Sequence, residues 1–168
     1  MHFRKILRGA PIAALMVAAL ALGACAQNPA GDANASAGAA AAPGSQQDFV
    51  VNVGDRVFFE TDQTDLTAQG RETLDKQAQW LTRYSQYTFT IEGHADERGT
   101  REYNIALGAR RAQSVRDYLV ARGIQAQRMR TISYGKERPV AVCNDISCWS
   151  QNRRAQTVLN SGGVVSQR

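Results

Sequence analysis

The chain has 168 residues, which is enough for one domain of ordinary size plus additional segments. Its formal charge is +5, but Arg4, Lys5 and Arg8 lie in a segment that we expect to be removed, which leaves the mature chain at about +2. A positive balance this weak, with no run of basic residues interleaved with aromatic ones, does not favour a nucleic-acid partner.

Residues 1–24 have the pattern of an export signal. The basic start is followed by an apolar run, Pro11 to Leu22, that is too short to span a bilayer comfortably. The run ends in Leu22-Gly23-Ala24-Cys25, which resembles the lipobox of bacterial lipoproteins. That resemblance implies cleavage before Cys25, with diacylglycerol on its sulfur and an acyl chain such as palmitate on its new amine. The alternative is an ordinary secretory signal with an incidental cysteine.

Residues 25–47 are expected to comprise the lipidated Cys25 and a flexible linker. After the cysteine, the stretch consists mainly of Ala, Gly, Asn, Ser and Pro, with almost no charge and few large apolar groups. Such a composition buries too little area to offset the entropy lost on ordering. A tether of this length spans on the order of 25 Å. The second mature residue is Ala26 rather than Asp, which resembles the signal for an outer-membrane destination.

A folded domain is predicted over 48–160, followed by a frayed tail at 161–168. Apolar spacing predicts strands near 57–59, 87–94, 130–134 and 155–159, and helices from the N-cap Thr67 to about 83, over 104–122 and over 146–151. The order β-α-β-α-β-α-β indicates an α/β fold, an α+β sandwich with helices packed on a four-stranded sheet. The sheet is either a single parallel wrap or mixed, because the short final connection permits an antiparallel neighbour.

A charged loop follows the second predicted strand. His94-Ala95-Asp96-Glu97-Arg98 lies between Gly93 and Gly99, and a rigid sheet end that holds charged residues is typical of a binding loop. Asp96 alone is typical of a capping or turn residue. Beside an arginine, its carboxylate would instead suit an ammonium group.

Arg111 falls within or beside the apolar stripe of the predicted 104–122 helix, together with Leu107 and Val115. A guanidinium in such a place is costly unless it is paired. One interpretation is an internal salt bridge, for instance to Asp96; the other is that Arg111 receives a ligand carboxylate through two parallel hydrogen bonds. If Asp96 and Arg111 face one pocket, they would suit the zwitterionic head of an amino acid.

His94 and the cysteines suggest structural roles. The only other histidine is His2, so a zinc site is not indicated, and no phosphate loop or nucleophile elbow appears; we expect no metal, cofactor or catalytic residue. We expect His94 to be hydrogen-bonded within the sheet. Cys143 and Cys148 are expected to form a disulfide in an exported protein, the alternative being two free thiols.

Four ordered motifs carry a family resemblance. They are Glu92 to Thr100, Tyr103 to Ala112 with Asn104, Leu107 and Arg110-Arg111, Ser133 to Pro139, and Asn152-Arg153-Arg154. Together with the lipobox, they resemble the peptidoglycan-associated lipoproteins, a group within the OmpA-like family, over about residues 49–160.

The resemblance implies a non-catalytic domain that binds the meso-diaminopimelate residue of the peptidoglycan stem peptide. By position, Asp96 would hold the ligand's ammonium group and Arg111 its carboxylate, and Asp62, Arg98, Asn104 and Leu107 match other pocket positions. Thr61 stands where many relatives have Phe. The resemblance also implies the Tol–Pal system of envelope integrity and cell division, with TolB and other Tol proteins as partners. The competing hypotheses are a peptidoglycan-modifying enzyme that uses His94 and Asp96, and a scaffold that binds only proteins.

Overall fold

The computed structural model describes residues 41–160, so the predicted signal, Cys25, most of the linker and the tail at 161–168 lie outside the described residues. Its elements, in chain order, are α1 (Gln46–Asp48), a π-helical turn (Phe49–Gly54), β1 (Arg56–Phe58), α2 (Ala68–Arg83), β2 (Phe89–His94), α3 (Arg101–Ala121), a 3₁₀ turn (Ala126–Arg128), β3 (Met129–Gly135), α4 (Ile146–Asn152) and β4 (Arg154–Leu159).

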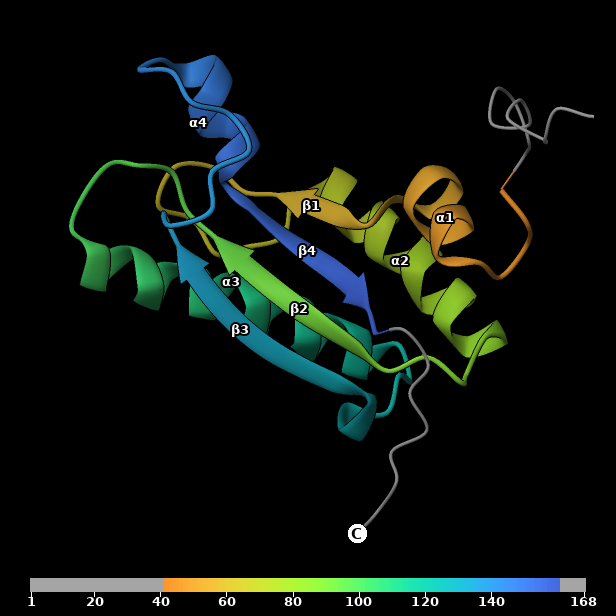
Figure 1. Cartoon of the computed structure of the whole chain (residues 1–168). Helices are drawn as coiled ribbons and strands as arrows, with labels where there is room; N and C mark the ends of the chain where they lie inside the picture. Colours follow the sequence, from red (N-terminus) through yellow and green to blue (C-terminus); the bar gives the residue numbers. More distant parts are fainter. Residues whose placement is uncertain (1–40, 161–168) are drawn as a thin grey trace, which may run out of the picture. The chain divides into compact units, whose positions relative to one another are not determined.

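The four strands form one mixed sheet in the order β1-β4-β2-β3 (Figure 1). β2 and β3 are parallel and are joined by a crossover through α3, whereas β4 lies between β1 and β2 and is antiparallel to both. This confirms the predicted element order and settles the sheet as mixed. The short connection through α4 brings the chain back antiparallel, as its length permits.

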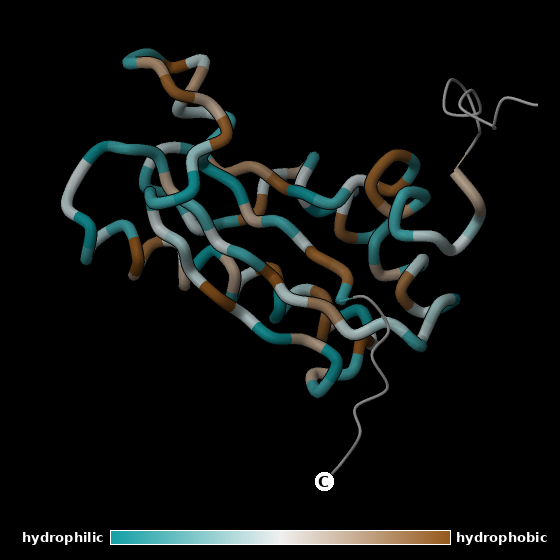
Figure 2. Tube along the Cα trace, viewed as in Figure 1, coloured by the Kyte–Doolittle hydropathy of each residue, from teal (hydrophilic) through white to brown (hydrophobic). Residues whose placement is uncertain are grey.

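The core lies between the sheet and the pair of helices α2 and α3. Alternate strand residues such as Phe89 and Ile91 pack against helix residues such as Leu74, Leu81 and Leu119, all of them fully buried. Figure 2 shows hydrophobic residues alternating with hydrophilic ones along these elements, whereas the loop between β2 and α3 is hydrophilic. The apolar core is thus formed by the strands and helices, and the polar residues of the loops at one end of the sheet are available to form a functional site.

Two glycines bring α3 into direct contact with the sheet. A Cβ on Gly93 of β2 would overlap the carbonyl oxygen of Gly108 in α3, and a Cβ on Gly108 would overlap the hydroxyl of Ser133 in β3. The helix therefore approaches as closely as backbone allows. Because Arg111 follows Gly108 by about one helical turn, this contact fixes its guanidinium against the end of β2.

The helix caps explain where α2 and α3 begin. Thr67 accepts a hydrogen bond from the Gly70 amide, as predicted. Thr100 caps α3 by accepting from the Tyr103 amide, so this helix begins three residues before the predicted Asn104. Helical spacing of apolar residues does not report the polar first turn, which explains the difference.

The ordered region begins earlier than the predicted boundary at residue 48. The Tyr87 hydroxyl donates to the carbonyl of Gly44 (2.8 Å), and the Gln46 amide donates to the carbonyl of Leu159 (3.2 Å). These contacts hold residues that the sequence placed in the linker. Among residues 41–160, no helix is long and apolar enough to cross a membrane.

Candidate functional site

Two loops and the first half of α3 meet at the end of β2. Arg98, in the loop after β2, donates to the Thr61 hydroxyl (3.3 Å) in the loop after β1. Tyr103, on α3, donates to Asp62 in that same loop (3.3 Å). Asp62 itself has a φ of 56°, a left-handed conformation that Asp tolerates better than most residues. These two hydrogen bonds join the loop after β1 to the loop after β2 and to the first turn of α3.

Arg111 is fully buried and braces this junction. Its Nε donates to the carbonyl of Gln63 (2.9 Å), Nη1 to that of His94 (2.8 Å) and Nη2 to that of Glu60 (3.1 Å). The ring of Phe59 lies beneath it, 5.1 Å from ring centre to guanidinium carbon. These bonds use three of the five N–H groups of arginine, which leaves one on each terminal nitrogen.

The charge of Arg111 has no carboxylate within ion-pair distance in the described part of the chain, so the internal salt bridge to Asp96 that we considered is not formed. Burial and the like charge of Arg153 lower the pKa of Arg111 to about 10, and the charges of Asp96 and Asp62 partly offset them. Arg111 is therefore still a cation at neutral pH. The dipoles of the three backbone carbonyls stabilise the positive charge of Arg111 in place of a carboxylate.

Asp96 is buried beside Arg111 but is paired with two other arginines. Arg98 donates to both of its oxygens (3.1 and 2.6 Å), and Nη1 of Arg153 lies 3.5 Å from Oδ2. Burial acts to raise the pKa of the Asp96 carboxyl, but the hydrogen bonds from Arg98 and Arg153 outweigh it and hold that pKa below its usual value. Asp96 is thus an anion that a cationic ligand group would share with Arg98.

Asn104 and Leu107 complete the predicted set. The Asn104 side chain is buried and donates to the carbonyl of Arg98 (2.7 Å), which fixes the turn that carries Asp96. Leu107 is buried one turn before Arg111. The structure therefore gathers all six predicted residues at the junction of the same two loops and α3.

Tyr103 and Arg153 are further members of this site to which the sequence gave no role. Both lie within motifs that carry the family resemblance, so their positions were visible in the sequence. Their partners, Asp62 and Asp96, become evident only when the loops are folded together.

His94 is structural, but the prediction that it is hydrogen-bonded is wrong. Its side chain is buried and neither ring nitrogen has a hydrogen-bond partner in the described residues; Glu92 Oε2 lies 3.7 Å from Nε2. The ring instead packs against Tyr134, with 5.6 Å between ring centres. Burial and the charges of Arg154 and Arg138 lower the pKa of His94 to about 4. The imidazole is therefore neutral at pH 7.

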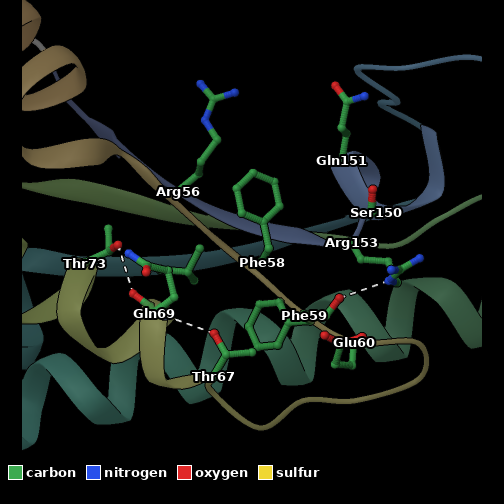
Figure 3. A pocket seen from close by; sticks show the side chains of 12 residues that line it. Arg56, Phe58, Phe59, Glu60, Thr67, Gln69, Thr73, Ser150, Gln151 and Arg153 are labelled. Atoms are coloured by element: carbon green, nitrogen blue, oxygen red, sulfur yellow. Dashed lines mark hydrogen bonds between the residues drawn. The ribbon is translucent and has the colours of Figure 1, made fainter. Parts of the chain in front are cut away.

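A neighbouring cavity of about 670 Å³ lies along β1, between the start of α2 and α4 (Figure 3). Arg56 and Phe58 point to one side of β1 and Phe59 to the other. None of the six predicted residues lines this cavity, which adjoins their site through Phe59, Glu60 and Arg153. Arg153 donates to the carbonyl of Phe59 (3.0 Å) and so separates the cavity from Asp96.

The described residues hold no group of three or more His, Cys, Asp and Glu side chains placed to bind a metal ion. Cys143 and Cys148 are joined in a disulfide, with their Cα atoms 5.7 Å apart. The site's chemistry therefore rests on carboxylates, guanidinium groups and backbone carbonyls.

Comparison with known sequences places this geometry in a family. The sequence model of the OmpA family matches residues 58–160, which include both loops and α3. The chain belongs to the OmpA family. This confirms the family that the four motifs indicate.

Relatives of this OmpA-family chain include the peptidoglycan-associated lipoprotein of Rhizobium meliloti, 64% identical over 158 residues that cover 91% of this chain and 89% of the relative. The peptidoglycan-associated lipoprotein of Brucella melitensis is 61% identical over 158 residues, with 91% and 94% covered. Both relatives are named as lipoproteins associated with peptidoglycan, and neither name is that of an enzyme.

Solved structures agree with the fold. The peptidoglycan-associated lipoprotein from Burkholderia pseudomallei superposes with a TM-score of 0.62 at 42% identity, covering 63% of this chain and 90% of that one. The C-terminal domain of Helicobacter pylori MotB superposes with a TM-score of 0.59 at 18% identity, covering 64% and 84%. The second likeness concerns the fold alone.

Proposed function

We propose that this OmpA-family domain binds peptidoglycan non-covalently by gripping the meso-diaminopimelate residue of a stem peptide. The observation that carries the proposal is that a buried Arg111 with no ion-pair partner in the described residues and an ionised Asp96 lie at one loop junction. The side chain of meso-diaminopimelate ends in an ammonium group and a carboxylate on one carbon. Asp96 suits the first group and the two unused N–H groups of Arg111 suit the second.

The mechanism requires only binding. Arg111 is already oriented by three carbonyls, so little conformational entropy remains to be lost when a carboxylate arrives. Because Arg111 is fully buried, the side chains that cover it must move to admit the ligand.

The relatives' names support a lipid-anchored protein of the cell envelope, and the lipobox at the start of the chain makes Cys25 the proposed anchoring residue. A lipid at one end and wall binding at the other would link the outer membrane to peptidoglycan, facing the periplasm. We propose a place in the Tol–Pal system of envelope integrity and cell division, with TolB and other Tol proteins as partners. Many weak links to one continuous wall would act through avidity.

The test is sedimentation with purified peptidoglycan. The wild-type chain should pellet with peptidoglycan that contains meso-diaminopimelate, and Asp96→Asn should remain largely in the supernatant because it keeps the shape but removes the anion. Asp117→Asn, an exposed carboxylate farther along α3, is the matched control and should pellet like wild type.

Competition sharpens the same experiment. A soluble stem peptide containing meso-diaminopimelate should displace the protein, whereas a peptide with L-lysine at that position should not, since lysine lacks the carboxylate for Arg111. Equal displacement by both peptides would refute the proposed roles of the two charges. A scaffold that binds only proteins would not pellet at all, and an enzyme would release soluble muropeptides.

A further inference from the structure

Trp149, on α4, contacts the loop that carries Asp96. Its indole N–H donates to Glu97 Oε1 at 2.9 Å, and the guanidinium carbon of Arg98 lies 4.3 Å from the centre of the indole ring. These two residues directly follow Asp96 in the chain. Trp149, from a distant segment, therefore contacts the two residues that follow Asp96, the predicted ammonium-binding residue.

Trp149 is itself carried by a well-fixed support. The buried Asn152 side chain accepts hydrogen bonds from the amides of Val140 and Ala141 (2.8 and 3.3 Å) and donates to the Ala141 carbonyl (2.8 Å). The Cys143–Cys148 disulfide closes the segment that leads into α4. The short helix thus holds its tryptophan at a set position beside the loop, at the end of the sheet seen at the top of Figure 1.

The backbone of the same part of the loop is held by Lys136. Lys136 donates to the carbonyls of Glu97 (3.2 Å) and Gly99 (2.7 Å) from the turn after β3. Those bonds fix the backbone, whereas Trp149 holds side chains. Of the two, only Trp149 contacts the guanidinium that binds Asp96.

We propose that Trp149 is a positioning residue of the ligand site: its indole orients Arg98 and Glu97, and through Arg98 it sets the position of the Asp96 carboxylate. The inference rests on the proposed function for its ligand. Arg98 is long and partly exposed, so without the indole face its guanidinium would sample other rotamers. Asp96 would then lose part of its charge-assisted pairing and its fixed orientation.

The first test needs no ligand. In the full-length chain, the Asp96 carboxyl is titrated by NMR in wild type, Trp149→Phe and Trp149→Ala. We expect the pKa of Asp96 to rise toward its usual value in Trp149→Ala, and to rise less in Trp149→Phe, which keeps a ring but loses the N–H. An unchanged Asp96 titration in Trp149→Ala would overturn the proposal.

Trp80→Phe is the matched control. Trp80 also donates its indole N–H to a carboxylate, Asp48 (2.8 Å), but it does so beside α1, away from the loop junction. It should lower thermal stability without moving the Asp96 titration. A shift as large as that of Trp149→Phe would show a general structural effect and would also overturn the proposal.

The second test measures binding by isothermal titration with a stem tripeptide containing meso-diaminopimelate. Trp149→Ala should weaken binding about tenfold, from the lost cation–π contact and hydrogen bond together. In an Arg98→Ala background the same substitution should have much less effect, because Arg98 transmits it. Additive losses would refute the route through Arg98. If wild type does not bind the tripeptide, the proposed function fails, while the Asp96 titration still decides the positioning role.

Discussion

Several buried or half-buried arginines in this domain bind backbone carbonyls more than they bind acids. Arg111 holds three carbonyls, Arg128 holds those of Leu81, Tyr84 and Tyr87, and Arg153 holds that of Phe59. At Arg111 the fork of N–H groups joins the loop after β1 to the end of β2, two segments that share no strand pairing. At Arg111 this bracing and the proposed ligand contact belong to the same guanidinium, so binding and folding are coupled there.

Arg111→Ala should therefore damage both stability and binding. Removing the guanidinium leaves the carbonyls of Glu60, Gln63 and His94 without this donor, and we expect the free energy of unfolding to fall by about 2–4 kcal/mol. Urea unfolding measures the loss, with Arg110→Ala, an exposed neighbour, as the control that changes little. An Arg111→Ala protein as stable as wild type would show that the carbonyl contacts contribute nothing.

His94 should make the domain sensitive to mild acid. Its folded-state pKa of about 4 lies below the unfolded value of 6.5, so the unfolded state takes up the proton first. Stability should therefore be intact above about pH 6.5 and fall as the pH drops toward about 4, by about 3 kcal/mol in total. Glu92, Arg138 and Arg154 are the charged groups that face the ring.

The measurement is thermal unfolding of wild type and His94→Phe across that pH range. The phenylalanine variant keeps the ring packing against Tyr134 and has no proton to bind. The stability of wild type relative to the phenylalanine variant should fall as the pH falls, because only wild type has this proton to bind. A difference independent of pH would contradict the assignment to His94 and point to the carboxylates instead.

At the scale of elements, every predicted strand and helix exists, and the clearest of them, α2 and β2, carry apolar residues at the period of their own geometry. The start of α3 was misplaced because Thr100 and the polar turn after it have no apolar signal. The burial of Arg111 followed from helical spacing. The carbonyl groups that Arg111 binds could not be predicted, because every residue has a backbone carbonyl and the sequence does not distinguish one from another.

The Cys143–Cys148 disulfide joins the segment before α4 to α4 itself, and it should stabilise this element and little else. Replacing Cys143 and Cys148 together by Ser opens a short loop, and loop-closure entropy gives a loss of about 2 kcal/mol. Chemical unfolding under non-reducing conditions measures it. Reduced wild type should match the variant, and an oxidised wild type no more stable than the variant would show that Asn152 alone holds the segment.

At the scale of the whole molecule, the site residues were predictable as a set only through the family motifs. Periodicity placed Arg111 inside and Asp96 in a loop, but their proximity depends on the Gly93–Gly108 contact, which the sequence does not announce. The motifs included Arg98, but its pairing with Asp96 was not predicted, and the contact of Arg153 with Asp96 joins residues 57 apart in the chain that only the completed fold brings together.

The anchoring prediction also belongs to this scale. Cys25→Ser removes the sulfur that would carry diacylglycerol, so the protein should move from the membrane pellet to the soluble periplasmic fraction. Cell fractionation and immunoblotting measure the change, with Cys143→Ser/Cys148→Ser as the control that stays in the pellet. A Cys25→Ser protein that still sediments with membranes would refute the anchor.

The contacts of Gly44 and Gln46 determine how the domain would respond to being pulled. They fasten the incoming chain near the start of β2 and the end of β4, whereas Asp96 and Arg111 lie beyond the far end of β2. Tension between a membrane and a wall would thus run lengthwise along the central strands. Strands loaded in that direction must slide past one another with all their hydrogen bonds strained at once, instead of peeling apart one bond at a time. If the domain links a membrane to the wall as proposed, this arrangement would give the link mechanical resistance.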